Sequence, residues 1–205
     1  IMRNQFGLLA AFVLLVACSK RDLMADKEGN ETINALAKKE GTFFSEISNI
    51  DLGDETAAEI SAFDPLTQRL FVVNNDGGSR IDVINFADPA NPVQLTSIDV
   101  TSFGGFINSV AVSNGKLAAA IEALDKVNPG KVVVFNTTTH AAISAITVGS
   151  LPDMVTFTPD GKFILTANEG EPNDAYTIDP LGTVSIISVE NNYAATTLDF
   201  SSFAS

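Results

Sequence analysis

The feature that most constrains the fold is one unit of sequence that occurs three times after residue 42. The copies begin "EISAFDPLTQRLFVVNND" at Glu59, "NSVAVSNGKLAAAIEA" at Asn108 and "DMVTFTPDGKFILTANEG" at Asp153. Each copy predicts a strand, a tight turn and a second strand, and each continues through a loop into two further alternating strands. Four strands in a repeat of roughly 40–50 residues are typical of one blade of a β-propeller.

We therefore predict an all-β protein, a β-propeller seen as three four-stranded blades of an incomplete ring. The expected blades are residues 58–103, 107–149 and 152–201, and a closing strand within 42–53 precedes them. Such a strand would cover a sheet edge that otherwise invites aggregation. Because propellers have roughly four to eight blades, we expect the chain to be the N-terminal portion of a longer protein. The alternative is an all-β sandwich with accidental periodicity.

The N-terminal segment has the pattern of an export signal. A basic start at Arg3 leads into an apolar run, and residues 1–17 end in Leu-Val-Ala directly before Cys18. The run is shorter than the ~20 residues that span a bilayer, so it predicts a lipoprotein signal peptide with lipidation at Cys18. A plain signal peptide with an incidental cysteine is the alternative. Residues 18–41 are polar and charged and predict a tether between the lipid and the domain.

The charge balance excludes one class of partner. The chain has 25 acidic and 12 basic residues and a formal net charge of -13. A nucleic-acid-binding surface needs clustered Lys and Arg to replace the counterions on phosphates, so we expect no nucleic-acid partner. The acidic balance fits a soluble extracytoplasmic protein, or a protein that binds cations. Ser19 after the cysteine does not resemble an inner-membrane retention signal, so we expect the protein at the outer membrane or cell surface.

The order of strands within a blade places the connections on two faces. Loops between strands two and three share one face, here called the loop face, with the connections between blades, and the other turns form the turn face. We predict Asn75, Glu122 and Asn168 at equivalent positions after the second strands, and a site in the long loop 169–182. Calcium prefers such oxygen ligands, and the alternative is a solvated acidic rim. The candidate cation ligands are Asn75, Asp76, Glu122, Asn168, Glu169, Glu171 and Asp174.

Catalysis has less support in the sequence. His140 is the only histidine and lies in a turn-face segment, and Cys18 is the only cysteine and is assigned to the anchor. A catalytic triad or a multi-histidine zinc site is therefore disfavoured, and no phosphate-binding or nucleophile-elbow motif is present. Acid–base work by Glu169 and Glu171 on a glycan is the remaining option, although acids on one loop rarely straddle a substrate.

Several stretches resemble one bacterial family. "INSVAVSNGKLAAAIEA", "LPDMVTFTPDGKFILTANEGEPNDAY" and "DPLGTVSII" are similar to the choice-of-anchor I proteins, relatives of the YncE-like and LVIVD-type surface propellers. The resemblance covers about residues 43–205 and implies a propeller at the cell surface, with lipidated Cys18 as the membrane anchor. It transfers no activity to named residues, although some members resemble secreted phosphoesterase modules.

Two functions remain open at this point. The first is a surface binding or scaffold module without enzymatic activity. Its loop face would bind a protein, a glycan or a phosphorylated small molecule, and the same face would bind calcium. The second is part of a metal-dependent secreted hydrolase of the phosphoesterase type.

Overall fold

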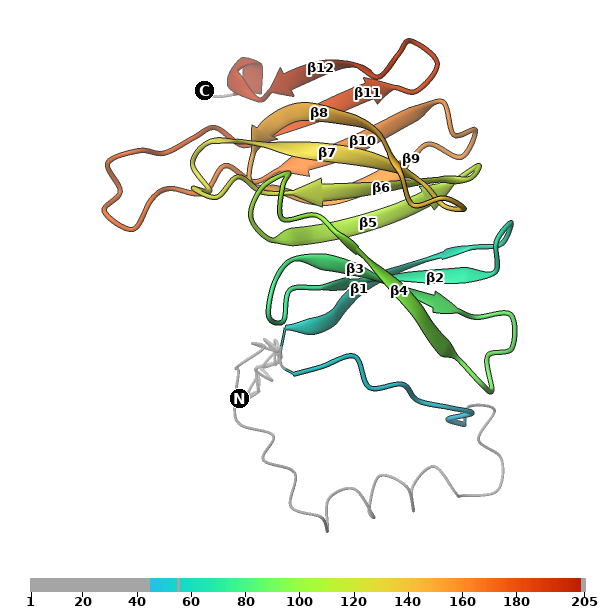
Figure 1. Cartoon of the computed structure of the whole chain (residues 1–205). Helices are drawn as coiled ribbons and strands as arrows, with labels where there is room; N and C mark the ends of the chain where they lie inside the picture. Colours follow the sequence, from blue (N-terminus) through green and yellow to red (C-terminus); the bar gives the residue numbers. More distant parts are fainter. Residues whose placement is uncertain (1–44, 55, 204–205) are drawn as a thin grey trace, which may run out of the picture. The chain divides into compact units, whose positions relative to one another are not determined.

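The computed structural model describes residues 45–54 and 56–203 and confirms the predicted all-β architecture (Figure 1). Three four-stranded antiparallel sheets follow one another along the chain, each ordered as a simple meander, as expected for propeller blades. A short 3-10 helix, Ser201–Phe203, follows the last strand. The strands are β1 (Ala57–Asp64), β2 (Arg69–Asn74), β3 (Arg80–Asn85), β4 (Val93–Asp99), β5 (Ile107–Ser113), β6 (Lys116–Ile121), β7 (Pro129–Asn136), β8 (Ala142–Ser150), β9 (Pro152–Phe157), β10 (Phe163–Asn168), β11 (Thr183–Ser188) and β12 (Ala194–Asp199).

Local sequence explains how each sheet forms. The central strands are rich in β-branched residues, as in "KVVVF" of β7, which favour extended backbone. The β5–β6 turn is Asn114-Gly115, and both residues have positive φ, 49° and 72°. Asn-Gly is the preferred pair for a two-residue turn of this kind, because glycine has no Cβ to clash in the left-handed region.

The core lies between consecutive sheets. Alternate residues of one sheet point to the preceding blade and the others to the following blade. Phe71, Ile81 and Val83 of blade one pack on blade two in the first cluster, which also contains Ile121 and Val133. The intervening residues of blade two, including Val132 and Val134, pack on blade three in a second cluster. Blade two is therefore buried on both faces.

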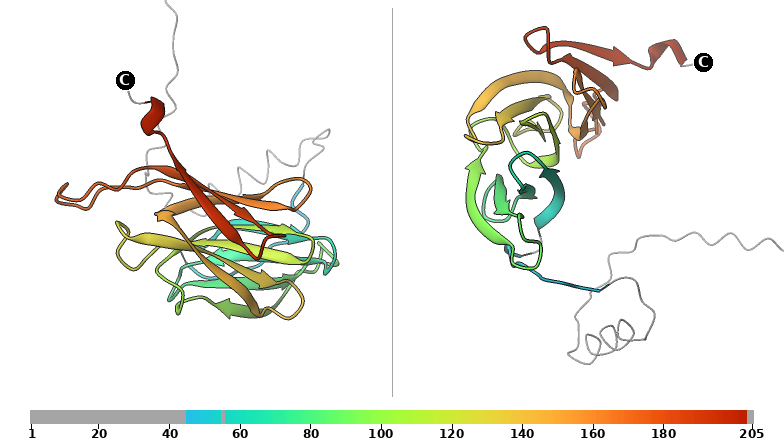
Figure 2. Two further views of the ribbon diagram at one scale, coloured as in Figure 1. Left: turned by 90° about the horizontal axis from the view of Figure 1, so that it is seen from above. Right: turned by 90° about the vertical axis from the view of Figure 1, so that its right-hand side faces the viewer.

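The first strands of the three blades lie next to one another. β5 contacts both β1 and β9, while the fourth strands β4, β8 and β12 form the opposite edges of their sheets. Figure 2 shows the sheets stacked in succession, with β12 at the edge of blade three. The first strands share no ladder with one another, so other groups must link consecutive blades along this line.

The predicted closing strand is not formed within the part of 42–53 that is described. Residues 45–53 contain no strand. A closing strand pairs with the third strand of a blade, but β3, β7 and β11 already have β4, β8 and β12 as neighbours. The segment instead contacts blade one, where Leu52 accepts a bond of 2.9 Å from Asn74 and Ser48 donates one of 2.6 Å to Pro89.

Several sequence predictions fall outside the described residues. The signal peptide at 1–17, the lipidation site Cys18 and the tether at 18–41 all lie there. Among the described residues, no helix has the length and apolar character that a membrane crossing requires.

An arginine and the single histidine join blades one and two on the turn face. The Arg69 guanidinium donates to the carbonyl oxygens of Thr137 and Thr138 at 2.9 and 3.1 Å and lies 2.9 Å from Nε2 of His140. The His140 ring also meets Phe71 edge-on, with centroids 6.2 Å apart. Burial, and then the charge of Arg69, lower the pKa of His140 below its ordinary value of 6.5.

This arrangement predicts a pH dependence. The unfolded chain takes up the His140 proton near pH 6.5 while the folded chain does not, so stability is lost as pH falls through 6.5 toward the folded pKa. Arg69→Gln should raise the His140 pKa toward 6.5, measured by proton NMR on the only imidazole of the protein. Lys162→Gln removes an exposed charge elsewhere and should leave the His140 pKa unchanged. A His140 pKa at or above 6.5 in the unmodified protein would contradict this assignment.

Candidate functional site

The loop face is formed as the strand order predicts. Loops 75–79, 122–128 and 169–182 connect second to third strands, and the linker 100–106 and Leu151 connect one blade to the next. In Figure 1 the two longer of these loops project to the left of the sheets, away from the turn face. All seven candidate cation ligands belong to these loops or to the strand residue directly before one of them.

The register corrects one predicted equivalence by a single residue. Asn74, Ile121 and Asn168 each end a second strand, opposite Arg80, Lys131 and Thr183 respectively. The residues that follow, Asn75, Glu122 and Glu169, each donate a backbone N–H to the residue before a first strand, at 3.0, 3.0 and 2.9 Å. Asn168 is therefore equivalent to Asn74, not to Asn75. Because side chains of a strand alternate between the two surfaces of the sheet, the Asn168 side chain points to the opposite surface from a residue at the Asn75 position.

Asn75 links blade one to blade two. Its Nδ2 donates to the carbonyl of Ile107 at 2.9 Å, and its Oδ1 accepts from the amide of Ile107 at 3.1 Å. Asn108 forms one similar bond between blades two and three, where its Nδ2 donates to the carbonyl of Pro152 at 3.0 Å. Proline has no amide hydrogen, so a single donor suffices there. These side chains supply polar links between neighbouring first strands.

Asn168 belongs to a buried polar row across blade three. Its Nδ2 donates to the hydroxyls of Thr183 and Ser185, both at 3.0 Å, and Ser185 lies 2.8 Å from the Thr197 hydroxyl. Its side chain is buried, and its Oδ1 has no hydrogen-bond partner among the residues that the structure describes.

Blade one holds a matching row at the same register. Asn74 donates to Asp82 at 2.6 Å and Ser97 donates to the same carboxylate at 2.6 Å. Blade two has the apolar Ile121 and Val133 at these positions. This polar row was not predicted from the sequence, although polar residues at corresponding strand positions of blades one and three indicate it.

The Asp76 side chain is hydrogen-bonded to the segment that precedes blade one. Its Oδ2 accepts from the amide of Asp54 at 3.3 Å, and its backbone carbonyl accepts from Arg80. Asp76 therefore helps to hold residues 46–54 against blade one.

Three of the candidate cation ligands surround a lysine. Lys126 forms an ion pair of 2.8 Å with Glu171. This bond, with the charges of Asp174 and Glu122, raises the pKa of Lys126. No group of three or more His, Cys, Asp or Glu side chains within residues 45–54 and 56–203 is arranged to hold a metal ion. Calcium binding stays a prediction, and a calcium ion here would compete with the Lys126 ammonium for the same oxygens.

Glu169 on the loop face has a carboxyl group with a raised pKa. Partial burial is the main cause, and the neighbouring carboxylates Asp153 and Glu171 add to it. Mutual repulsion of carboxylates is relieved by protonation or by a nearby cation. Lys126 supplies such a cation to Glu171.

The long loop 169–182 is held in a defined conformation by one asparagine. The Asn173 Oδ1 accepts from the amides of Thr177 and Ile178 at 2.9 and 3.2 Å, and its Nδ2 donates to the Thr177 hydroxyl at 2.9 Å. The Asn173 amide donates to the Ile178 carbonyl at 3.0 Å. Apolar side chains remain outward on this loop, and Tyr176 is 81% exposed.

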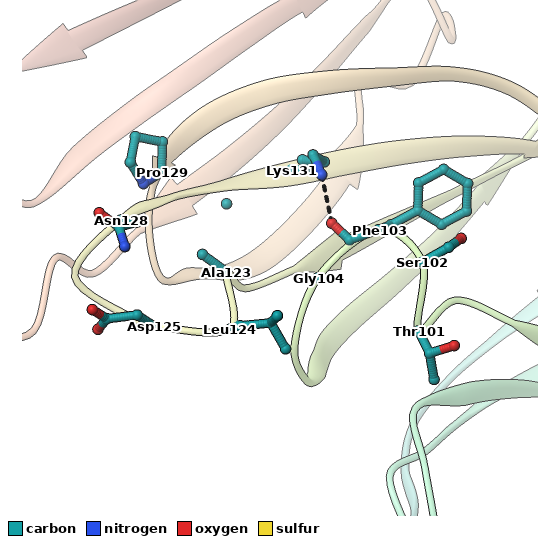
Figure 3. A pocket seen from close by; sticks show the side chains of 11 residues that line it. Thr101, Ser102, Phe103, Gly104, Ala123, Leu124, Asp125, Asn128, Pro129 and Lys131 are labelled. Atoms are coloured by element: carbon teal, nitrogen blue, oxygen red, sulfur yellow. Dashed lines mark hydrogen bonds between the residues drawn. The ribbon is translucent and has the colours of Figure 1, made fainter.

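Pockets open between the connections of this face. One of about 380 Å³ lies between the linker 100–106 and the segment 123–131 (Figure 3). Others lie where Lys126 meets the loop 169–182 and beside Gly77 and Gly78.

The profile of the choice-of-anchor I domain matches residues 59–205. The chain belongs to this family. The match covers all three blades and the whole loop face except the segment before blade one. The resemblance noted from the sequence is confirmed.

Other comparisons add little. No curated protein shows significant similarity to the chain. Among solved structures, the chain is similar to a chain of Kuenenia stuttgartiensis hydrazine synthase, with 13% identity, a TM-score of 0.39, and coverage of 69% of this chain and 54% of that chain. The choice-of-anchor I chain therefore spans about half the length of that structure.

Asn75 provides a test of whether this position is architectural or metal-binding. Asn75→Ala leaves the amide and carbonyl of Ile107 without their side-chain partners. We expect a loss of about 1–3 kcal/mol in the free energy of unfolding, the usual penalty for unpaired polar groups. The loss, measured by urea denaturation, should be the same with and without millimolar calcium. A loss that appears only with calcium present would instead identify Asn75 as a cation ligand.

Proposed function

We propose that this choice-of-anchor I chain is a cell-surface binding module, attached to the membrane through lipidated Cys18. Its loop face contacts a protein or glycan partner. Membership of the family supports a surface module in bacteria. The sequence pattern before Cys18 supports the lipid anchor.

The observation that carries this proposal is an ordered loop with apolar side chains pointing outward. Loop 169–182 is fixed by Asn173 and tied to the neighbouring loop by the Lys126–Glu171 ion pair. Its exposed apolar residues are Tyr176, Ile178 and Leu181, and Leu124 of the neighbouring loop is 91% exposed. Clustered exposed apolar groups with a polar surround mark interaction surfaces, and an ordered loop loses less entropy on binding.

The charges of the loop face limit the kinds of partner that it can bind. Glu122, Glu171 and Asp174 lie around a single lysine, so the loop face is acidic overall. A partner with a basic and apolar surface would be attracted to it, and its Lys or Arg side chains could replace Lys126 at Glu171. Tyr176 offers an aromatic ring on which a sugar ring could also stack. A nucleic acid would be repelled.

Nothing observed in the described residues specifically favours the hydrolase alternative. His140 lies on the turn face, where it contacts Arg69. Six of the seven candidate cation ligands, all except Glu169, are used in internal contacts or lie around Lys126. The binding function therefore fits the described residues better.

Photo-crosslinking on intact cells tests the proposal. A photoreactive phenylalanine at Tyr176 should form adducts with a surface component. The same residue at Leu66, which is 71% exposed on the turn face, should not. Cys18→Ala should release the protein from the membrane fraction and abolish the adducts on cells. Equal adducts from both positions, or adducts from Leu66 alone, would contradict binding through the loop face.

A further inference from the structure

The pocket beside Lys131 has features of a small-molecule site that the proposed function does not use. It lies at the blade one–blade two junction, between the linker 100–106 and the segment 123–131, and encloses about 380 Å³. Known ligand sites range from roughly 300 to 1,000 Å³. Figure 3 shows Lys131 and Phe103 at one end of this space and Asp125 at the other.

Lys131 is a half-buried ammonium with unused donors. Its Nζ donates to the backbone carbonyl of Phe103 at 2.7 Å. No carboxylate within the described residues lies in ion-pair range of Lys131, whereas Lys126 and Lys162 each have a glutamate partner. An ammonium has three hydrogens to donate. Two of them are left for a ligand, and an anionic oxygen is the group that a partly desolvated ammonium favours.

The walls of this pocket are built into the fold. The linker is pinned to the next loop by paired backbone bonds, from Gly105 to the Glu122 carbonyl at 2.8 Å and from Glu122 to the Phe106 carbonyl at 3.0 Å. Phe103 packs edge-on against Phe135 at 5.9 Å, which fixes the carbonyl that Lys131 contacts. The backbone at Gly130 lies so close to Pro152 that a Cβ would come within 2.5 Å of its Cδ. The pocket is therefore preformed.

The lining selects the type of anion. The aromatic, aliphatic and proline side chains around the pocket offer an apolar surface, and Ser102 and Asn128 add neutral polar groups. The apolar lining residues are Phe103, Ala123, Leu124 and Pro129. Asp125 at the far end and the net charge of -13 disfavour a dianion. A singly charged ligand with an apolar body matches both features.

We infer that this pocket binds a small monocarboxylate with an apolar body. Its carboxylate accepts from Nζ of Lys131, and its apolar part lies against Phe103 and Leu124. The site adds a small-molecule ligand to the loop face. It shares Leu124 with the proposed interaction surface but uses none of Tyr176, Ile178 and Leu181 of loop 169–182.

The test is a titration of the full chain with benzoate and hexanoate, followed by amide shifts in nitrogen–proton NMR. We expect saturable shifts at Gly104 and Gly105 of the linker and at Gly130 of β7. Lys131→Gln keeps a donor for the Phe103 carbonyl but removes the charge, and it should weaken benzoate binding about tenfold or more, as expected for a charge-assisted hydrogen bond. Lys116→Gln, on the turn face of the same blade, should leave the affinity unchanged.

Further variants and ligands separate the effect of the Lys131 charge from other causes. Lys131→Arg retains the charge and should retain binding, which separates charge from folding effects. Benzamide, which is neutral, should bind about tenfold more weakly than benzoate. Benzoate affinity that is unchanged in Lys131→Gln, equal affinity for benzamide, or tighter binding of inorganic phosphate would each overturn the inference. Replacing Tyr176 by serine should not alter benzoate binding, so failure of the proposed surface function leaves this result intact.

Discussion

Face-to-face packing of consecutive sheets is the constraint on which the rest of the structure depends. Blade two is buried on both faces, and each residue from Leu117 to Ile121 of β6 is fully buried. Truncating Leu117 or Ile121 of this strand to alanine costs about 2–5 kcal/mol, whereas an exposed ion pair such as Lys126–Glu171 contributes little to stability. The apolar contacts between consecutive blades, here called the seams, therefore determine where the blades lie. The ion pairs of the loop face affect only the positions of surface side chains.

Polar groups complete the seams where apolar packing cannot. The first strands lie side by side without a shared ladder. Asn75, which follows β2, and Asn108 of β5 each form hydrogen bonds with the first residue of the next blade's first strand. On the turn face, Arg69 of blade one donates hydrogen bonds to the carbonyls of Thr137 and Thr138 of blade two. Because these links join the connections of neighbouring blades, they also determine how the loops and pockets of the loop face are placed. Asn75 thus serves the site by positioning the β5 end of the linker, and no metal is needed for that role.

The repeated strand–turn–strand unit was sufficient to predict the three blades and their two faces, because alternation and turn residues are local signals. Side-chain roles were harder to predict. Asn168 was matched to Asn75 through a shift of one position, and in a strand one position is the difference between the two surfaces of the sheet. The segment 42–53 has the composition of a strand, but whether a strand forms depends on a free partner edge, which sequence patterns do not reveal.

The pairing of Lys126 with Glu171 joins two loops that are distant in sequence, and no local pattern predicts it. The pocket at Lys131 likewise arises from the close approach of a linker to a strand of another repeat. Both features follow from how the blades stack. They could only be found once the register of each sheet was known.

The central claim, that stacked blades are stabilised by the seams on both faces of blade two, is tested most directly by hydrogen exchange resolved along the chain. Amides of β6 and β7 should exchange slowest, at the rate set by global unfolding, because both faces of these strands are buried. Amides at the outer edge of β12, whose residues are all exposed, should exchange fastest among the strands. Equal protection of β12 and β7, or faster exchange in blade two than in blade three, would contradict the account.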